Sequence, residues 1–158
     1  MPSDPFMEED SRVLTPEAFD FVLNNELKRA VRSQNFLTLL LLEPTVRRPT
    51  EESAATDVVR ELARLVSREV RETDLLSRTT AGQLSVVLLD ADLPNSMLVV
   101  ERLVSRFQHC AFPAPMAIQV GAACCPTHGA DAESLRRAAE IRPVHPRRDD
   151  RGNASHVQ

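Results

Sequence analysis

The segment that most constrains the fold of this chain covers residues 71–92 and reads RETDLLSRTTAGQLSVVLLDAD. Two short apolar runs, Leu75-Leu76 and residues 84–89, flank a turn that contains Gly82, and this pattern predicts a β-hairpin. The segment begins where an amphipathic helix should end and leads directly into the next helix. It therefore predicts the order helix, strand, strand, helix, around which the remaining elements can be placed.

The first helix is predicted from Thr15-Pro16-Glu17. The threonine supplies a capping hydroxyl, the proline occupies a position that needs no N–H donor, and the acid lies near the positive end of the helix dipole. The helix should end near Gln34. Apolar residues recur at helical spacing and predict its buried face: Phe19, Leu23, Leu27 and Val31, widened by Val22 and Ala30.

A continuous apolar run over residues 36–42 predicts a strand buried on both faces, which should be the central strand of the sheet. A loop is expected over residues 45–49. The remaining elements follow from cap residues and apolar spacing: a helix from about 50 to 70–73, a helix beginning at Asp92, a strand over 116–123, and a last helix capped by Asp131 and ended by Pro143 and Pro146.

Without its first and last helices, the predicted order is βαββαβ, the arrangement of ferredoxin-like and palm domains, in which helices cover one face of an antiparallel sheet. The fold class is therefore α/β, as an α+β sandwich with an extra helix at each end. With 158 residues, of which 42% are hydrophobic, the chain can form one domain with an apolar core. That domain is predicted over residues 13–142, with disordered ends over 1–12 and 143–158.

Composition excludes several classes of function. The net charge of −4 and the pI near 5.6 argue against a DNA-binding or membrane-surface protein, because such proteins need a large positive field. The acidic N-terminal residues do not resemble a signal peptide, and no apolar run is long enough to cross a bilayer, so a cytoplasmic protein is expected. Cys110, Cys124 and Cys125 suggest neither a disulfide framework nor a zinc site, and buried, inert thiols are expected.

Five segments between residues 14 and 140 share their order and register with one known family. They are LTPEAF, FLTLLLLE, VVRELARLVSREVRETDLLSR, SVVLLDADLPNSMLVVERL and IQVGAACCPTHGADAESLRRAAE. This collinear set resembles the GGDEF family, the bacterial diguanylate cyclases that make cyclic di-GMP from two GTP molecules. The resemblance implies the palm-type nucleotidyl-cyclase fold and a role in signal transduction.

The signature turn of that family is replaced in this chain. Where the family has Gly-Gly-Asp/Glu-Glu-Phe, this sequence has Thr80, Ala81, Gly82, Gln83 and Leu84. The family's glycines let the backbone approach the triphosphate, and its acid shares magnesium with a carboxylate at the end of the first strand. Here Gln83 brings no negative charge, and Glu43 alone cannot assemble a two-metal site. The resemblance therefore implies a degenerate domain without cyclase activity, and no magnesium cofactor is expected.

Residues 71–74, Arg-Glu-Thr-Asp, fall in the register of the Arg-x-x-Asp motif that forms the family's inhibitory product-binding site. An arginine fork matches the O6 and N7 acceptors of guanine, and the carboxylate of Asp74 could accept from its N1 and N2 donors. Arg102 matches a second arginine that reaches the ligand in the family, and Arg78 could add positive potential toward the phosphates. The alternative interpretation is a surface ion pair between Arg71 and Asp74, worth well under about 1 kcal/mol.

Three hypotheses follow for the function. The leading one is an inactive GGDEF domain that binds cyclic di-GMP through Arg71, Asp74 and Arg102 and relays the signal to another signalling protein or to a second copy of itself. The alternative is a nucleotide-independent pseudoenzyme that serves as an interaction or dimerisation module. The third is an active cyclase with an altered turn, against which the metal dependence of the reaction argues.

Overall fold

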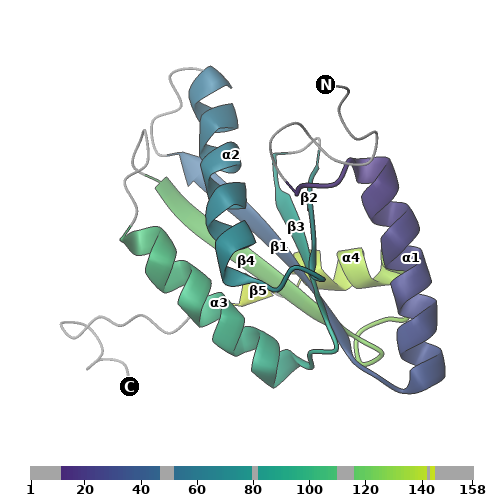
Figure 1. The fold of residues 1–158 in the computed structure, drawn as a ribbon. Helices are drawn as coiled ribbons and strands as arrows, with labels where there is room; N and C mark the ends of the chain where they lie inside the picture. Colours follow the sequence, from purple (N-terminus) through teal and green to yellow (C-terminus); the bar gives the residue numbers. More distant parts are fainter. Residues whose placement is uncertain (1–11, 47–51, 80–81, 110–115, 142, 145–158) are drawn as a thin grey trace, which may run out of the picture.

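The computed structural model describes residues 12–46, 52–79, 82–109, 116–141 and 143–144, and within them four helices and five strands form one layered domain (Figure 1). The elements follow the predicted order, with one short strand added at the end. They are α1 (Pro16–Ser33), β1 (Leu37–Val46), α2 (Glu52–Glu69), β2 (Leu75–Arg78), β3 (Leu84–Leu89), α3 (Leu93–Gln108), β4 (Met116–Cys125), α4 (Ala132–Ile141) and β5 (Pro143–Val144).

The strands form one antiparallel sheet in the order β2-β3-β1-β4-β5, so the prediction that β1 is central is confirmed. β1 is longer than predicted, because Thr45 and Val46 pair with β4 where a loop was expected. Pro44 is tolerated within it because the pairing of β1 with β3 ends at Leu42, which leaves one side of β1 without a neighbouring strand at the proline.

Alternate residues of β1 face opposite layers of helices, which explains its continuous apolar run. Leu40 and Leu42 pack in a core with α2 and α3, whereas Leu39 and Leu41 pack in a second core with α1 and α4. The prediction that helices cover one face of the sheet is confirmed for α2 and α3, but it did not include helices on the other face. The two outer helices cover the other face, so the sheet is enclosed on both sides (Figure 1).

The buried face of α1 is narrower than predicted. Val31 is 49% exposed and Val22 is only half-buried, whereas Ala30, which was predicted to widen the face, is buried. Residues four positions apart drift by about 40° around a helix, so a strict four-residue repeat leaves the core after three steps. The predicted start is confirmed, because the Thr15 hydroxyl accepts a hydrogen bond from the Ala18 N–H at 3.3 Å.

Both predicted disordered ends contain ordered residues next to the domain. Pro143 and Val144 form β5 and pair with Gly121 and Val120 of β4. At the other end, Arg12 donates hydrogen bonds to backbone carbonyl groups near the end of α2. These residues are held by tertiary contacts that local composition does not show. Residues 1–11 and 145–158 lie outside the described part of the chain.

Two of the three cysteines, Cys124 and Cys125, are buried as predicted, and burial raises the pKa of the Cys125 thiol. A buried thiol with a raised pKa carries less of the reactive thiolate. Cys110 lies outside the described residues. Among the helices that the structure describes, none combines the length and hydrophobicity needed to cross a membrane.

Loss of the α3 cap should destabilise the domain modestly. The Asp92 carboxylate accepts the Asn95 N–H at 3.0 Å. We expect Asp92→Ala to lower the free energy of unfolding by about 1 kcal/mol, and Asp92→Asn to lose much less because asparagine also caps helices well. Urea denaturation followed by circular dichroism measures both. Equal losses in the two variants would contradict the capping role.

Candidate functional site

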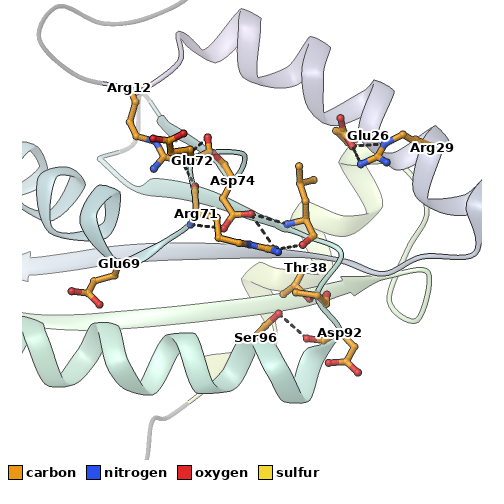
Figure 2. Close-up of polar contacts among 12 residues, drawn as sticks. Arg12, Glu26, Arg29, Thr38, Glu69, Arg71, Glu72, Asp74, Asp92 and Ser96 are labelled. Atoms are coloured by element: carbon orange, nitrogen blue, oxygen red, sulfur yellow. Dashed lines mark hydrogen bonds and ion pairs between the residues drawn. The ribbon is translucent and has the colours of Figure 1, made fainter.

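Residues 71–74 form a tight turn between α2 and β2 that is closed twice. The Asp74 N–H donates to the Arg71 carbonyl at 3.0 Å, and the Asp74 carboxylate accepts the Arg71 N–H at 3.0 Å. The other carboxylate oxygen accepts the Leu89 N–H at 3.1 Å, at the end of β3 (Figure 2). The Asp74 side chain is only 3% exposed. Asp74 therefore fastens this turn to the end of β3.

Arg71 projects from the same turn, and its side chain is 60% exposed. Its guanidinium donates to the Leu89 carbonyl and lies 3.6 Å from the Asp74 carboxylate (Figure 2). The alternative of a simple surface ion pair does not describe this arrangement, because Asp74 is buried and also bonds to two backbone N–H groups. Arg71 is held at its tip, while more than half of its side chain stays accessible to a ligand.

A cavity of about 300 Å³ opens beside this turn, between the end of α2, the end of β3 and the first turns of α3. Arg71, Asp74 and Arg102 all line it, so the structure brings together three residues that the sequence placed in one site. The partly buried side chains of Val70, Ala91 and Val99 contribute apolar wall. Such a mixture of apolar wall and a few converging charged groups is typical of a small-molecule site.

Arg102 enters the cavity already paired with an acid. Its Nε donates to the Glu69 carboxylate at 3.0 Å, and its Nη2 donates to the Glu69 carbonyl at 2.8 Å. Arg106 lies 3.3 Å from the same carboxylate. The Glu69 side chain is 17% exposed, so this cluster is partly shielded from solvent. Glu69 therefore occupies part of the positive surface that Arg102 would offer to an anion.

Arg78, the fourth predicted ligand residue, is not part of this site. It is the last residue of β2, whereas the Arg71–Asp74 turn precedes the first residue of that strand. It pairs in the sheet with Leu84 and is absent from the lining of the cavity. The structure thus separates Arg78 from the three residues that it brings together.

The hairpin between β2 and β3 contains residues 80–84, which the resemblance aligned with the family signature. The Thr79 N–H donates to the Gln83 carbonyl at 2.8 Å, and Gly82 has a φ of 84°, which favours glycine. Leu84 is fully buried, while Thr80 and Ala81 lie outside the described residues. The Gln83 side-chain amide donates to the Glu43 carboxylate at 3.4 Å. An N–H donor therefore faces Glu43 where a metal would need an oxygen ligand.

Solved structures share this architecture. The GGDEF domain of TpbB, also called YfiN, from Pseudomonas aeruginosa matches with a TM-score of 0.74 and 16% identity, over 85% of this chain and 84% of that one. This chain has the GGDEF-domain fold. The GGDEF domain of DgcB from Caulobacter crescentus, solved in complex with c-di-GMP, matches with a TM-score of 0.71 and 12% identity over 89% of this chain and 86% of that one.

A third solved structure with the GGDEF fold is the diguanylate cyclase SiaD from Pseudomonas aeruginosa in complex with its activator SiaC. It matches with a TM-score of 0.71 and 19% identity over 85% of this chain and 55% of that one. No protein-family model and no curated protein matches the sequence. The fold thus rests on structural likeness, and the properties of the site rest on its own geometry.

Two residues that line this cavity, Glu69 and Asp90, were not predicted from the sequence. Glu69 stands at the C-terminal end of α2, where the helix dipole disfavours an acid. Its position there could have indicated a partner cation, which the structure identifies as Arg102 together with Arg106. Asp90 lines the cavity in the left-handed backbone region, with a φ of 56°, and nothing in its sequence context signals this.

The resemblance implied a metal site that includes the Glu43 position, and the residues described there do not fit one. Among the described residues, no group of three or more His, Cys, Asp or Glu side chains is arranged to hold a metal ion. Glu43 is exposed and contacts the amide of Gln83. Among the described side chains, those near Glu43 offer a divalent cation one carboxylate, that of Glu43 itself.

Proposed function

We propose that this protein is a catalytically inactive GGDEF domain that binds cyclic di-GMP in the cavity beside Arg71 and relays the signal through protein–protein contact. The observation that carries this proposal is that Arg71, in the turn after α2, and Arg102, on α3, line the same cavity. The complex of the structurally similar DgcB domain with c-di-GMP supports this choice of ligand.

Each side chain has a role that its geometry allows. The Arg71 fork pairs with the O6 and N7 acceptors of one guanine, and Arg102 reaches the neighbouring phosphate. Asp74 acts mainly by holding the turn that presents Arg71, because its carboxylate is buried and bonded to two backbone N–H groups. Val70, Ala91 and Val99, which are partly buried, offer apolar surface to the base.

The size of the cavity suggests how a signal could leave the domain. At about 300 Å³ it lies at the lower end of the range for ligand pockets, about 300–1,000 Å³. It can enclose one guanine and its phosphate but not a whole cyclic dinucleotide. The other half of the ligand would remain at the mouth, where another signalling protein or a second copy of this chain could contact it.

Titration calorimetry with cyclic di-GMP tests the proposal. We expect saturable binding below high micromolar ligand, and binding of cyclic di-AMP at least 10-fold weaker, because adenine presents an N6 donor where guanine presents the O6 acceptor. The absence of any heat of binding at high micromolar cyclic di-GMP would overturn the receptor function. Equal affinity for the two dinucleotides would contradict guanine recognition by Arg71.

Incubation with GTP and magnesium is expected to give no cyclic di-GMP. The reason is that the turn carries Gln83 and no acid of its own, and the Gln83 amide pairs with Glu43, whereas a two-metal reaction needs a second acid. Chromatography of the reaction mixture measures the product. Product formation that is lost in Glu43→Gln would show an active cyclase with an altered turn and contradict the proposal.

The Glu69→Gln variant is expected to bind cyclic di-GMP more tightly than the natural sequence, by roughly 5- to 10-fold. The variant removes the negative charge that competes with the ligand for Arg102. Glu61→Gln is a matched control, because Glu61 also lies on α2 and pairs with a single exposed arginine, Arg64. Weaker binding in Glu69→Gln, with an unchanged thermal midpoint, would contradict this competition.

One observation favours the alternative function, a nucleotide-independent interaction module. The cavity lining contains three acids, Glu69, Asp74 and Asp90, against two arginines, so its charge is not strongly positive. If calorimetry detects no nucleotide, this composition is the reason, and the domain is then a pseudoenzyme that acts through its outer surfaces. A stable complex with a partner protein, unchanged in Arg71→Ala, is the result that this alternative predicts.

A further inference from the structure

The chain segment that precedes α1 is attached to the turn that carries Arg71. The Arg12 Nη2 donates to the Arg71 and Asp74 carbonyls, each at 2.6 Å, and lies 3.3 Å from the Glu72 carbonyl. Its Nη1 donates to the Ser67 carbonyl at 3.2 Å. One guanidinium thus holds the last turn of α2 through Ser67, and it also holds the turn over residues 71–74, beside which Figure 2 shows Arg12.

The two residues after Arg12, Val13 and Leu14, are also held by contacts with the domain. Val13 is 2% exposed and packs in the core with α2 and α3. The Leu14 N–H donates to the Leu76 carbonyl at 2.8 Å, and the Ser77 hydroxyl donates to the Leu14 carbonyl at 3.0 Å. Residues 12–14, here called the N-terminal arm, therefore lie along β2 at the edge of the sheet, with a parallel bridge between Leu14 and Ser77.

Physical chemistry explains why an arginine stands at this position. The last carbonyl groups of a helix have no partner within the helix, and the helix dipole favours a cation there. An arginine can satisfy several carbonyls at once because its donors are spread over a planar fork. Arg12 therefore links a carbonyl in the last turn of α2 to carbonyls of the following turn.

We propose that Arg12 is a positioning residue of the cavity and that the N-terminal arm and the cavity are energetically coupled through the Arg71–Asp74 turn. The arm contacts the backbone carbonyls of this turn, whereas the side chains of Arg71 and Asp74 line the cavity. Docking of the arm and binding of a ligand in the cavity would therefore both stabilise the turn over residues 71–74. The ligand part of this inference rests on the proposed function, whereas the link between Arg12 and the turn does not.

Coupling of this kind is reciprocal. If docking of the arm strengthens ligand binding by some factor, ligand binding strengthens docking of the arm by the same factor. A force or a partner that detaches residues 12–14 would then release the ligand, and the ligand would hold the arm in place. The arm becomes an input through which another part of an assembly can set the affinity of the cavity.

Amide hydrogen exchange without ligand tests the first part. The reporters are the N–H groups of Arg71 and Leu89, which both donate to the Asp74 carboxylate. We expect Arg12→Ala to accelerate exchange at these two groups about 10-fold, with Arg12→Lys intermediate, while Leu40 at the centre of the sheet stays unchanged. Arg137→Ala is the matched control, because Arg137 pairs with Glu133 within α4 and does not line the cavity. Unchanged exchange at the reporters, or equal acceleration throughout the sheet, would overturn the positioning role.

Calorimetry and exchange with cyclic di-GMP test the second part. We expect Arg12→Ala to weaken binding about 10-fold and saturating ligand to slow exchange of the Leu14 N–H in the natural sequence. Binding that is equally tight in Arg12→Ala would overturn the coupling. If the natural sequence itself binds no cyclic di-GMP, the receptor function and the coupling to ligand both fail, and the exchange at Arg71 and Leu89 still decides whether Arg12 positions the turn.

Discussion

The Gly121→Val variant is expected to lose at least about 3 kcal/mol of unfolding free energy, the upper part of the range for overpacking a core. A Cβ atom at Gly121 would lie 2.1 Å from the carbonyl oxygen of Ala139 and 3.0 Å from its carbonyl carbon. Both atoms belong to the backbone of α4, so no side-chain rotation relieves the clash. The helix would have to move away from β4 and expose Leu135, which is fully buried.

Urea denaturation followed by circular dichroism measures this loss, which is large against the 5–15 kcal/mol that stabilises a typical domain. Gln119→Val is the matched control, because Gln119 lies on the same strand with an exposed side chain, and the change should stay within about 0.5 kcal/mol. A loss below about 1 kcal/mol in Gly121→Val would contradict the close packing of α4 on β4.

The Arg71→Ala variant is expected to bind cyclic di-GMP about 30- to 100-fold more weakly than the natural sequence. Truncation removes a charged fork with two parallel hydrogen bonds to one base and leaves the O6 and N7 acceptors of guanine unpaired. Arg71→Lys should recover little of this affinity, because a lysine keeps the charge but cannot make the bidentate contact.

Arg64→Ala is the control for this prediction, because Arg64 lies on α2, is about as exposed as Arg71, pairs with Glu61 and does not line the cavity. It should leave the affinity unchanged. A thermal midpoint measured for each variant separates loss of binding from loss of fold. Unchanged binding in Arg71→Ala would place the ligand elsewhere on the domain.

Much of the fold could be predicted because its signals are local. The caps at Thr15 and Asp92 and the hairpin around Gly82 each lie within a few residues of the elements that they define. The position of α1 and α4 on the second face of the sheet could not be predicted in the same way. An amphipathic stripe shows that a helix packs against something, and only the alternation along β1 shows that both faces need cover.

The candidate site could also be predicted only in part. The register of the resemblance placed Arg71, Asp74 and Arg102 together, and in the structure all three line one cavity. Their partners were not predictable, because the Leu89 N–H that holds Asp74 and the Glu69 that holds Arg102 belong to no sequence pattern. Arg12 is the clearest case, since it bonds to carbonyls that are 55 to 62 residues away in the chain.

The central claim is that the cavity beside Arg71 binds cyclic di-GMP while the hairpin at Gly82 does not act on nucleotides. Titration of the ¹⁵N-labelled protein with cyclic di-GMP, followed by amide chemical shifts, tests it directly. We predict saturable shifts at Arg71, Leu89, Asn95 and Arg102, with Gly82 and Gln83 unmoved. No shifts at high micromolar ligand, or shifts confined to Gly82 and Gln83, would contradict it.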